Sequence, residues 1–449
     1  MHSGYAPTAP QKRLDNRSTG VLTASARLDC DGRRSCADFL YLHQVAQVVQ
    51  MPAPQRRVAT WHSAAGGIMD QWRTPGHRLK LYLLAHGIAI DPAAEHAWRQ
   101  KYDGPLSLSE YASTSGVCLY TRSGAYVNAP FLEEFTRNSA AVLRHWAGEF
   151  VIEFQGQMFS VGVVPVPQYH KLSYRDGDEW YPYTNLGVTH TDRVRISPIE
   201  GCAWRCRFCD MGYEKHYRKK PVEELVEVIR LAAKDPLVPA RHVLISGGTP
   251  HTRDQGWLDD VYEYVAARSP LPVDVMMPAR TDPDYHRWLR SVGVQMVSIN
   301  LEVWDEDRAR LVTPNKARQL GRGLYLESIE RAVEAFGVGQ VQSLLVFGES
   351  VESLDGTLQA VRALAERGCI PVLSPFRPDA ATPMGNLPPT RCGEMRYALD
   401  AAEKICETAG TGVKPGPRCV PCQHNTVSFP DGSDFYLPWA PTTAASCVI

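Results

Sequence analysis

The sequence lacks long apolar stretches. No run approaches the roughly 20 consecutive apolar residues that a membrane-spanning helix needs. The opening residues, MHSGYAPTAPQKRLDNRSTG, also lack the apolar centre of a secretory signal. These absences argue against a membrane protein and against a secreted one. We therefore expect a cytoplasmic protein, with residues 1–20 disordered because they are polar and contain Pro, Gly and Ser.

The sequence also lacks an excess of either charge. Its 48 Lys and Arg residues nearly balance 49 Asp and Glu residues, which gives a formal net charge of -1. Proteins that hold nucleic acid along a broad face carry a basic excess. Nucleic acid is therefore a disfavoured partner, and a small-molecule substrate is the default expectation.

Cysteine is present in quantity, but without an obvious disulfide framework. The chain has 12 cysteines, and in a reducing compartment cysteines serve as thiols or metal ligands more often than as disulfides. Three of them follow a C-x3-C-x2-C spacing within one short stretch, at Cys202, Cys206 and Cys209. Closely spaced thiolates favour an iron–sulfur cluster, zinc or Cu(I). The compact spacing predicts that all three bind one inorganic centre.

The number of these cysteines carries information of its own. A [4Fe–4S] cluster normally takes four cysteines, so three leave one iron with an open coordination position. Such a position is where a substrate or cofactor can bind. The alternative is a structural zinc loop that His216 completes.

A repeating pattern of short apolar runs and amphipathic stretches begins near residue 193. It is typical of βα units and a parallel sheet. The predicted strands are 193–199, 241–248, 272–278, 294–300, 341–348 and 370–376. The predicted helices include 221–234, with Pro221 in its first turn, and 353–368, with Gly368 at its C-terminal cap. The fold class is therefore α/β, a partial or complete parallel (β/α)6-type barrel whose core spans residues 191–380.

Segments of different character flank this core. Residues 21–190 predict an α+β extension of unknown role, with helical patterns at 38–50 and 77–90 and a β-hairpin at 149–167 around a Gly-Gln turn. Residues 381–449 predict a helix and a short tail that contains cysteines.

The stretch CAWRCRFC, which holds the three cysteines, resembles the cluster loop of the radical S-adenosylmethionine (radical SAM) superfamily, including the aromatic Phe208 before the third cysteine. A second stretch, ISGGTP, follows the second predicted strand. Its glycines remove side chains, so a ligand can approach the backbone. It is similar to the superfamily's GGE-type motif, which receives the methionine amino group, although Thr249 replaces the usual glutamate. The residues concerned are Ser246, Gly247, Gly248 and Thr249.

Two further stretches extend the resemblance. In SINLEVWDEDRAR, Asn300 and Glu302 alternate with Leu301, so both can face the barrel mouth, where the resemblance implies contact with ribose hydroxyls. Arg308 or Arg310 is then a candidate for the methionine carboxylate, with a solvated helix surface as the alternative. The stretch LLVFGES resembles the adenine-side glycine motif, which points to Gly348.

The resemblance implies a [4Fe–4S] cluster and S-adenosylmethionine as cofactors, and a low-potential electron donor such as a flavodoxin or ferredoxin as a partner. The expected chemistry is reductive cleavage of S-adenosylmethionine to a 5'-deoxyadenosyl radical, which takes hydrogen from a substrate. Arg377, after the sixth predicted strand, is a candidate contact for an anionic substrate, with a surface salt bridge as the alternative.

The tail offers a second group of chemically active residues, Cys419, Cys422 and His424. One hypothesis is a second iron–sulfur cluster or metal site, completed by a cysteine at position 369, 392, 406 or 447. Others are a substrate-facing or catalytic thiol at Cys419 or Cys422, or a purely structural turn.

Three functions remain in competition. The preferred one is a radical SAM enzyme that acts on a small molecule in a biosynthetic pathway by rearrangement, deoxygenation, epimerisation or cyclisation. The second is a peptide-modifying radical SAM maturase whose N-terminal domain binds a leader peptide. The third is a non-catalytic regulator that binds an iron–sulfur cluster or zinc.

Overall fold

The computed structural model describes residues 73–102, 104–106, 115–121, 125–213, 216–418 and 420–429. The chain divides into two compact units, Met1–Gly67 and Ile68–Ile449. All described residues belong to the second unit. The predictions for residues 1–20 and for a helix at 38–50 lie outside the described residues, as do Cys419 and Cys447.

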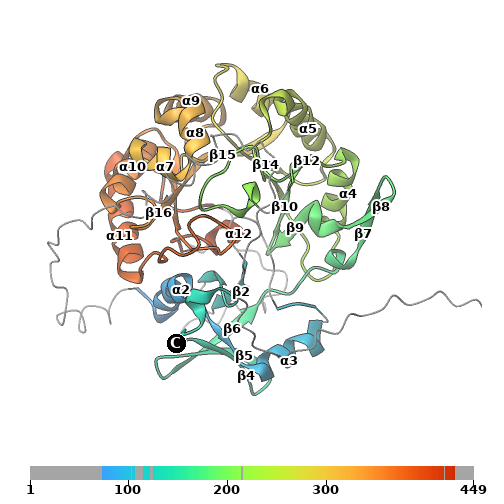
Figure 1. Ribbon diagram of the computed structural model, residues 1–449, viewed down its shortest axis with the longest axis vertical. Helices are drawn as coiled ribbons and strands as arrows, with labels where there is room; N and C mark the ends of the chain where they lie inside the picture. Colours follow the sequence, from blue (N-terminus) through green and yellow to red (C-terminus); the bar gives the residue numbers. More distant parts are fainter. Residues whose placement is uncertain are drawn as a thin grey trace, which may run out of the picture. The chain divides into compact units, whose positions relative to one another are not determined.

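A seven-stranded sheet forms the centre of the described structure (Figure 1). Its strand order is β17-β16-β15-β14-β13-β10-β9. All neighbours are parallel except β9 and β10, which are antiparallel. The strands are β9 (Gly187–His190), β10 (Arg193–Ile196), β13 (His242–Ile245), β14 (Val273–Met277), β15 (Val294–Ile299), β16 (Val341–Phe347) and β17 (Ile370–Pro375).

Helices cover the outer side of this sheet (Figure 1). Between successive parallel strands they return the chain to the start of the next one, the connection that parallel strands require, and α11 follows the last strand, β17. They are α4 (Val222–Ala233), α5 (Gln255–Arg268), α6 (Tyr285–Ser291), α7 (Glu306–Val312), α8 (Pro314–Gln319), α9 (Gly321–Phe336), α10 (Leu354–Glu366) and α11 (Cys392–Ala409).

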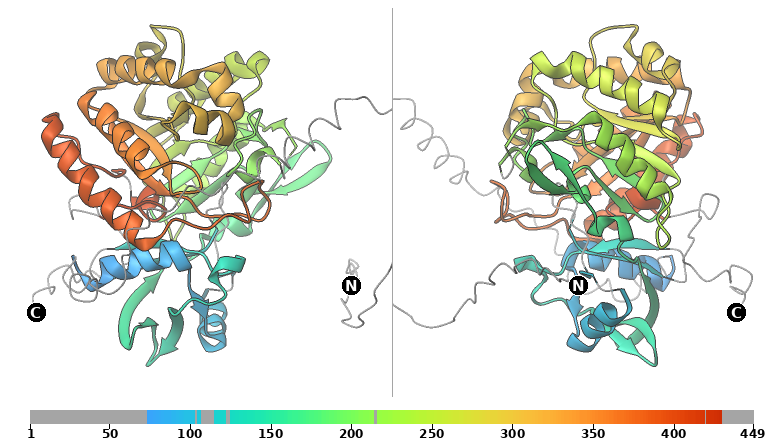
Figure 2. Two further views of the ribbon diagram at one scale, coloured as in Figure 1. Left: turned by 60° about the vertical axis from the view of Figure 1, so that its left-hand side comes forward. Right: turned by 90° about the vertical axis from the view of Figure 1, so that its right-hand side faces the viewer.

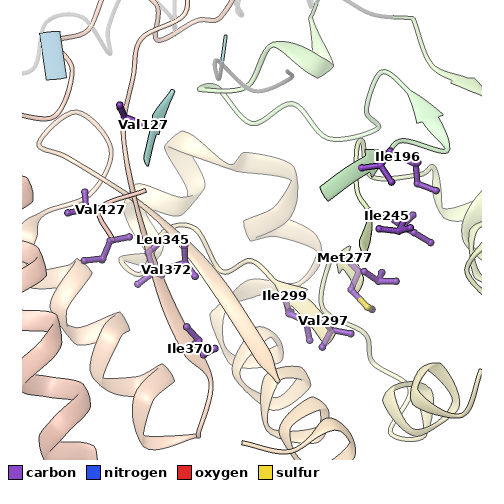
Figure 3. Packing of buried hydrophobic residues seen from close by; sticks show 14 of the residues in the cluster. Val127, Ile196, Ile245, Met277, Val297, Ile299, Leu345, Ile370, Val372 and Val427 are labelled. Carbon is purple, nitrogen blue, oxygen red and sulfur yellow. The ribbon is translucent and has the colours of Figure 1, made fainter. Parts of the chain in front are cut away.

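The six predicted strands and the α/β barrel class are confirmed. Apolar side chains from successive strands pack into one continuous core (Figure 3); those labelled in the sheet are Ile196, Ile245, Met277, Val297, Ile299, Leu345, Ile370 and Val372. Local signals also held. The hydroxyl of Ser353 caps α10 by accepting from the amide of Gly356 at 3.0 Å, and Gly368 follows α10 with a φ of 75°.

The sequence reading missed the edge strand β9. It placed residues up to 190 in the N-terminal extension, yet Gly187–His190 pairs with β10 across a two-residue turn and belongs to the barrel sheet. Strand β9 is only four residues long and carries Thr and His among its apolar residues, so its hydrophobic pattern is weak.

The N-terminal extension contains a six-stranded sheet in the order β1-β4-β5-β6-β2-β3. Two helices accompany it, α2 (Pro75–His86) and α3 (Pro92–Tyr102). Helix α2 packs against α11 of the barrel (Figure 2). The strands are β1 (Ala89–Ile90), β2 (Val117–Thr121), β3 (Tyr126–Ala129), β4 (Val142–Trp146), β5 (Glu149–Phe154) and β6 (Gln157–Val163).

The predicted hairpin is β5 and β6. Its turn residues are Gln155 and Gly156, one position before the expected Gly-Gln pair, and both have positive φ, as a type I′ turn requires. Two smaller hairpins complete the strands, β7 (Ser173–Asp176) with β8 (Glu179–Pro182), and β11 (Ile199–Glu200) with β12 (Arg218–Lys219).

A segment near the C-terminus connects the two edge strands of the open barrel. We call residues 422–428 the closing segment; it includes the end of the short helix α12 (Val420–Gln423). The amide of Val427 donates to the carbonyl of Leu373 on β17 at 2.9 Å. At the other edge, the ring of His424 lies 5.1 Å from the ring of His190, the last residue of β9. The closing segment therefore spans the gap in the barrel wall.

A buried lysine holds the closing segment to the extension. Lys80 on α2 is 1% exposed, and its ammonium donates to the carbonyls of Gln423, at 2.7 Å, and Ser428. Burial lowers the pKa of Lys80 well below its usual value. The two carbonyls are therefore what makes a lysine tolerable at this place.

Among the described residues, no helix combines the length and the apolar character needed to cross a bilayer.

We predict that Lys80→Ala destabilises the protein. The change leaves two buried carbonyl groups without their donor, at a cost of about 1–3 kcal/mol each, so the thermal unfolding midpoint should fall by several degrees. Lys404→Ala, on the exposed surface of α11, is the matched control and should leave the midpoint unchanged. Equal midpoints for the two variants would contradict the role given to Lys80.

Candidate functional site

A cavity of about 270 Å³ opens at the carboxyl ends of the barrel strands. This is the end where α/β barrels build their active sites. Its walls come from the loop that follows β10, from the turn after β13, from the ends of β14 to β17 and from the closing segment.

The three cysteines of the loop after β10 all line this cavity. Burial raises the pKa of each thiol above its usual value. For Cys202, the effect is partly offset by the amides of Thr249 and Trp204, which lie 3.2 and 3.3 Å from its sulfur. The charges of neighbouring cysteines raise these pKa values further: Cys202 raises the pKa of Cys206, and both Cys206 and Cys202 raise the pKa of Cys209. The three thiols are therefore close enough to interact. Thiolates buried in this way need a cation beside them.

The spacing of the three sulfurs argues against a single ion. Among the described residues, only one group of three or more Cys, His, Asp or Glu ligand atoms lies within 4.8 Å of one another, and the loop cysteines are not in it. Ligands of one zinc ion must be that close, whereas ligands of different irons in a cluster stand farther apart. His216, which the zinc alternative needed, is exposed. The loop therefore fits a cluster better than a zinc ion.

The ISGGTP segment packs directly on the cysteine loop. The amide of Ala203 donates to the carbonyl of Thr249 at 2.9 Å. A Cβ atom on Gly248 would lie 1.8 Å from the carbonyl oxygen of Gly201, and one on Gly247, whose φ is 131°, would lie 2.3 Å from the hydroxyl of Ser197. Both positions therefore require glycine, because the side chain of any other residue would collide with the segment from Ser197 to Gly201. Their predicted approach to a ligand remains a prediction, although both line the cavity.

A buried ion pair lies at the end of β15. Glu302 has a φ of 70°, rare for a residue other than glycine. Its carboxylate lies 2.6 Å from the ammonium of Lys316, and the two side chains are 15% and 9% exposed. Burial alone would lower the pKa of Lys316, but the charges of Glu302, Tyr325 and Cys206 and the hydrogen bond to Glu302 together outweigh it and raise the pKa. The pair also acts on Cys206, whose pKa Glu302 raises and Lys316 lowers.

Asn300 lies beside this pair and lines the cavity. Its side-chain oxygen accepts from the hydroxyl of Ser298 at 2.7 Å and from the amide of Leu344 at 3.2 Å. The oxygen therefore joins β15 to β16, and the amide hydrogens are the part of Asn300 that can serve as ribose donors. The ribose contacts of Asn300 and Glu302 remain predictions.

The two arginines proposed for the methionine carboxylate lie away from the cavity. Arg308 and Arg310 are on the exposed side of α7, and Arg310 pairs with Asp307 and Glu306 of the same helix. Neither lines the cavity. The reason is helical periodicity, which turns both side chains to solvent once α7 packs through Val312.

The remaining motif residues divide between the cavity and the framework. Phe208 lines the cavity and packs on an apolar cluster that includes Val303 and Val346. Gly348 has a φ of 129°, and a Cβ atom there would lie 2.4 Å from the hydroxyl of Thr390. The structure thus gives Gly348 a packing role, and its adenine contact remains a prediction. Ser246 lines the cavity beside Met276.

Three guanidinium groups also line the cavity. Arg193 and Arg195 alternate along β10 and so face the same side. Arg377 follows β17 and donates to the carbonyl of Asn128 at 3.0 Å and to the side-chain oxygen of Asn425 at 3.2 Å. All three arginines are less than 9% exposed. The lining of the cavity therefore includes three buried arginines, which we call the arginine wall.

Cys422 is the tail cysteine that the structure describes, and it also lines the cavity. Its sulfur accepts from the Nη1 atom of Arg193 at 2.7 Å. Cys369, Cys392 and Cys406 are dispersed through the fold and do not form a metal-type group with it among the described residues. The completion of a second site by one of these three cysteines therefore stays a prediction.

The model of the radical SAM superfamily matches residues 196–361, which contain the cysteine loop, the GG segment and the Glu302–Lys316 pair. Residues 196–361 therefore form a radical SAM superfamily domain. The predicted resemblance is therefore confirmed. Membership implies a [4Fe–4S] cluster and S-adenosylmethionine, and the burial and spacing of the three thiols fit that cluster.

Comparisons with individual proteins are more distant. Over 225 residues the chain is 22% identical to a bacteriochlorophyllide c C-7(1)-hydroxylase of Chlorobaculum limnaeum, a match covering 45% of this chain and 54% of the relative. The chain thus spans about half the length of this curated relative. Similar solved structures include a radical SAM methyltransferase from Sphaerobacter thermophilus (16% identity, TM-score 0.40, 62% and 76% of the two chains). Another is the FeFe-hydrogenase maturase of Carboxydothermus hydrogenoformans (15% identity, TM-score 0.36, 50% and 54%).

Sequence reasoning missed three residues of this radical SAM site. Lys316 follows the SINLEVWDEDRAR stretch by six residues, but nothing in its spacing showed that it returns to Glu302. Arg193 and Arg195 could have been found, because two arginines that alternate within a buried parallel strand face one side and need a polar environment there.

We predict that Gly248→Ala prevents assembly of the radical SAM cluster. The added methyl group would collide with the carbonyl of Gly201, so the cysteine loop must move away from the amide of Thr249. Iron per chain after anaerobic reconstitution should fall to a small fraction of the wild-type value. Gly256→Ala on α5, where a Cβ atom meets nothing within 4 Å, is the control and should load normally. Normal iron content in Gly248→Ala would show that the loop tolerates displacement.

Proposed function

We propose that this protein is a radical SAM enzyme that cleaves S-adenosylmethionine reductively and acts on a small anionic substrate. The observation that carries the proposal is the meeting of three buried thiols and a wall of three arginines on one cavity of about 270 Å³. A non-catalytic regulator has no need of such a cavity. The size favours a small molecule over a folded partner.

Within this proposal the cysteine loop holds the cluster through Cys202, Cys206 and Cys209. When bound, the cluster supplies one electron to S-adenosylmethionine, which yields methionine and a 5'-deoxyadenosyl radical that takes hydrogen from the substrate. A low-potential donor such as a flavodoxin or ferredoxin would provide the electron. The reaction that follows is a rearrangement, deoxygenation, epimerisation or cyclisation of the substrate.

The residues of the chain have three tasks in this reaction. Gly248 and the amide of Thr249 fix the loop by close contact and a hydrogen bond to Cys202. The Glu302–Lys316 pair places fixed charges beside Cys206, where Glu302 raises the pKa of the thiol and Lys316 lowers it. Buried charges of this kind are more effective than the same charges in water, because the low dielectric does not screen them.

The arginine wall supports an acidic substrate. Arg193, Arg195 and Arg377 contribute positive charge to the cavity lining, and the planar guanidinium group suits a carboxylate or a phosphate. An anionic group held there would fix the position of the substrate relative to the cluster loop, which is the main contribution a radical enzyme makes to selectivity.

The test of the proposed function is anaerobic. The full-length protein is reconstituted with iron and sulfide, reduced with dithionite and incubated with S-adenosylmethionine, and 5'-deoxyadenosine is measured by mass spectrometry. We expect about four irons per chain and 5'-deoxyadenosine formation. Replacing Cys202, Cys206 and Cys209 together by alanine should abolish both, because the variant loses all three thiols that the loop offers to the cluster.

Cys369→Ala, in the apolar core, is the matched cysteine control and should keep both activities. Iron or 5'-deoxyadenosine retained in the triple variant would contradict the assignment. A wild-type protein that holds zinc in the loop and takes up no cluster would also contradict the assignment of the loop as a cluster site.

We further propose that Cys422 is a substrate-facing thiol of this site. It lines the cavity with its sulfur fixed by Arg193, whereas its partner in the motif, Cys419, lies outside the described residues. Cys422→Ser should leave iron content unchanged and alter turnover or product distribution once a substrate is found. A loss of iron in this variant would instead favour a second cluster at Cys419 and Cys422.

A further inference from the structure

Outside the cluster loop, three side chains converge in the interior of the protein. They are Cys118, His190 and His424, and one ligand atom from each lies within 4.8 Å of the others. Their exposed fractions are 2%, 0% and 0%. The Cys118 sulfur lies 3.8 Å from the Nδ1 atom of His424, and the rings of the two histidines are 5.1 Å apart and tilted by 44°.

The three residues come from three separate parts of the fold. Cys118 is on β2 of the N-terminal sheet, His190 ends the barrel edge strand β9, and His424 belongs to the closing segment. Their backbones are fixed by neighbouring pairs. Cys118 faces Asn128 in the β2–β3 register, and the amide of Asn128 donates to the carbonyl of His424 at 2.9 Å.

His190 is held in the same way, opposite Arg193 in the β9–β10 pairing. Each ligand is thus positioned by regular secondary structure or by a hydrogen bond to it, and not by a free loop. Ligands on rigid elements are what a metal site requires, because the donor atoms must keep their mutual distances when the ion binds.

The donor set selects the metal. One sulfur and two imidazole nitrogens are borderline to soft donors, which suit zinc and exclude the oxygen-preferring Mg²⁺ and Ca²⁺. Zinc takes Cys and His together in tetrahedral sites, and three protein ligands leave the fourth position to water or to one further donor.

We propose that Cys118, His190 and His424 bind a zinc ion. The ion joins the N-terminal sheet, the β9 edge of the barrel and the closing segment into one structure. Because Cys422, Asn425 and Thr426 of the closing segment line the cavity, the zinc ion also fixes one wall of the substrate space. The site is distinct from the cluster loop. Of the residues expected to form a metal site in the tail, Cys419, Cys422 and His424, it contains only His424.

The test measures zinc and iron on the same samples. Full-length protein is produced with zinc in the medium, purified anaerobically and reconstituted with iron, and both metals are counted by mass spectrometry. We expect about one zinc per chain in the wild type. Cys118→Ser and His424→Gln should lose at least most of the zinc and keep the iron, whereas the Cys202, Cys206 and Cys209 triple alanine variant should lose the iron and keep the zinc.

Two matched controls address nonspecific effects. Cys369→Ser and His286→Gln each change a buried residue of the same type elsewhere in the barrel and should keep the zinc. Wild-type protein with no more zinc than the background, zinc retained in both ligand variants, or copper in place of zinc would overturn the proposal. Failure of the cluster test leaves this result unaffected, since the two metals are counted separately.

A second measurement covers variants that fail to fold. The wild-type protein is stripped with a zinc chelator, and Co²⁺ is added to the stripped protein. A sulfur-to-cobalt charge-transfer band should appear in the wild type and in Cys369→Ser. The thermal unfolding midpoint should fall on stripping and return with Zn²⁺ but not with Mg²⁺. Absence of the band, or a midpoint that does not respond to stripping, would contradict a zinc site.

Discussion

The structure depends on one constraint, the burial of three thiols in one loop. Contacts with other parts of the barrel fix the conformation of that loop. The loop follows β10, and its sulfurs face the cavity at the carboxyl ends of the strands. Burial opposes ionisation of these thiols, so the ionised form that binds iron needs the positive charge of the iron itself. Cluster binding and the folding of this loop are therefore linked, and contacts that fix the loop act on both.

Two sets of contacts fix the loop, and both come from later parts of the chain. The segment around Gly248 approaches the loop so closely that a single methyl group would not fit. The Glu302–Lys316 pair adds buried charges beside Cys206. On the far side, the closing segment spans the two barrel edges, held by Lys80 and, in our proposal, by zinc. In this account the cysteine loop bounds the cavity, and the proposed zinc ion stabilises the closing segment that lines it.

Much of this architecture could be predicted from the sequence, because its signals are local. The six parallel strands are short apolar runs, the cysteine spacing lies within eight residues, and Ser353 and Gly368 mark the ends of a helix by their own conformational preferences. What could not be predicted is non-local. Lys316 returns to Glu302 across a turn of the fold. Cys118, His190 and His424 are separated by 72 and 234 residues, and no spacing rule connects them. Arg308 and Arg310 were misplaced because the motif did not show which face of α7 is buried.

The central claim is that the loop holds a cluster with one iron open to S-adenosylmethionine. The most direct measurement is the electron paramagnetic resonance spectrum of the reduced, reconstituted protein, recorded with and without S-adenosylmethionine. An amino and a carboxylate group that bind the open iron change the field around the cluster, so the account predicts a spectrum that shifts on addition of S-adenosylmethionine in the wild type. A cluster signal that is identical in both samples, at saturating S-adenosylmethionine, would contradict the account.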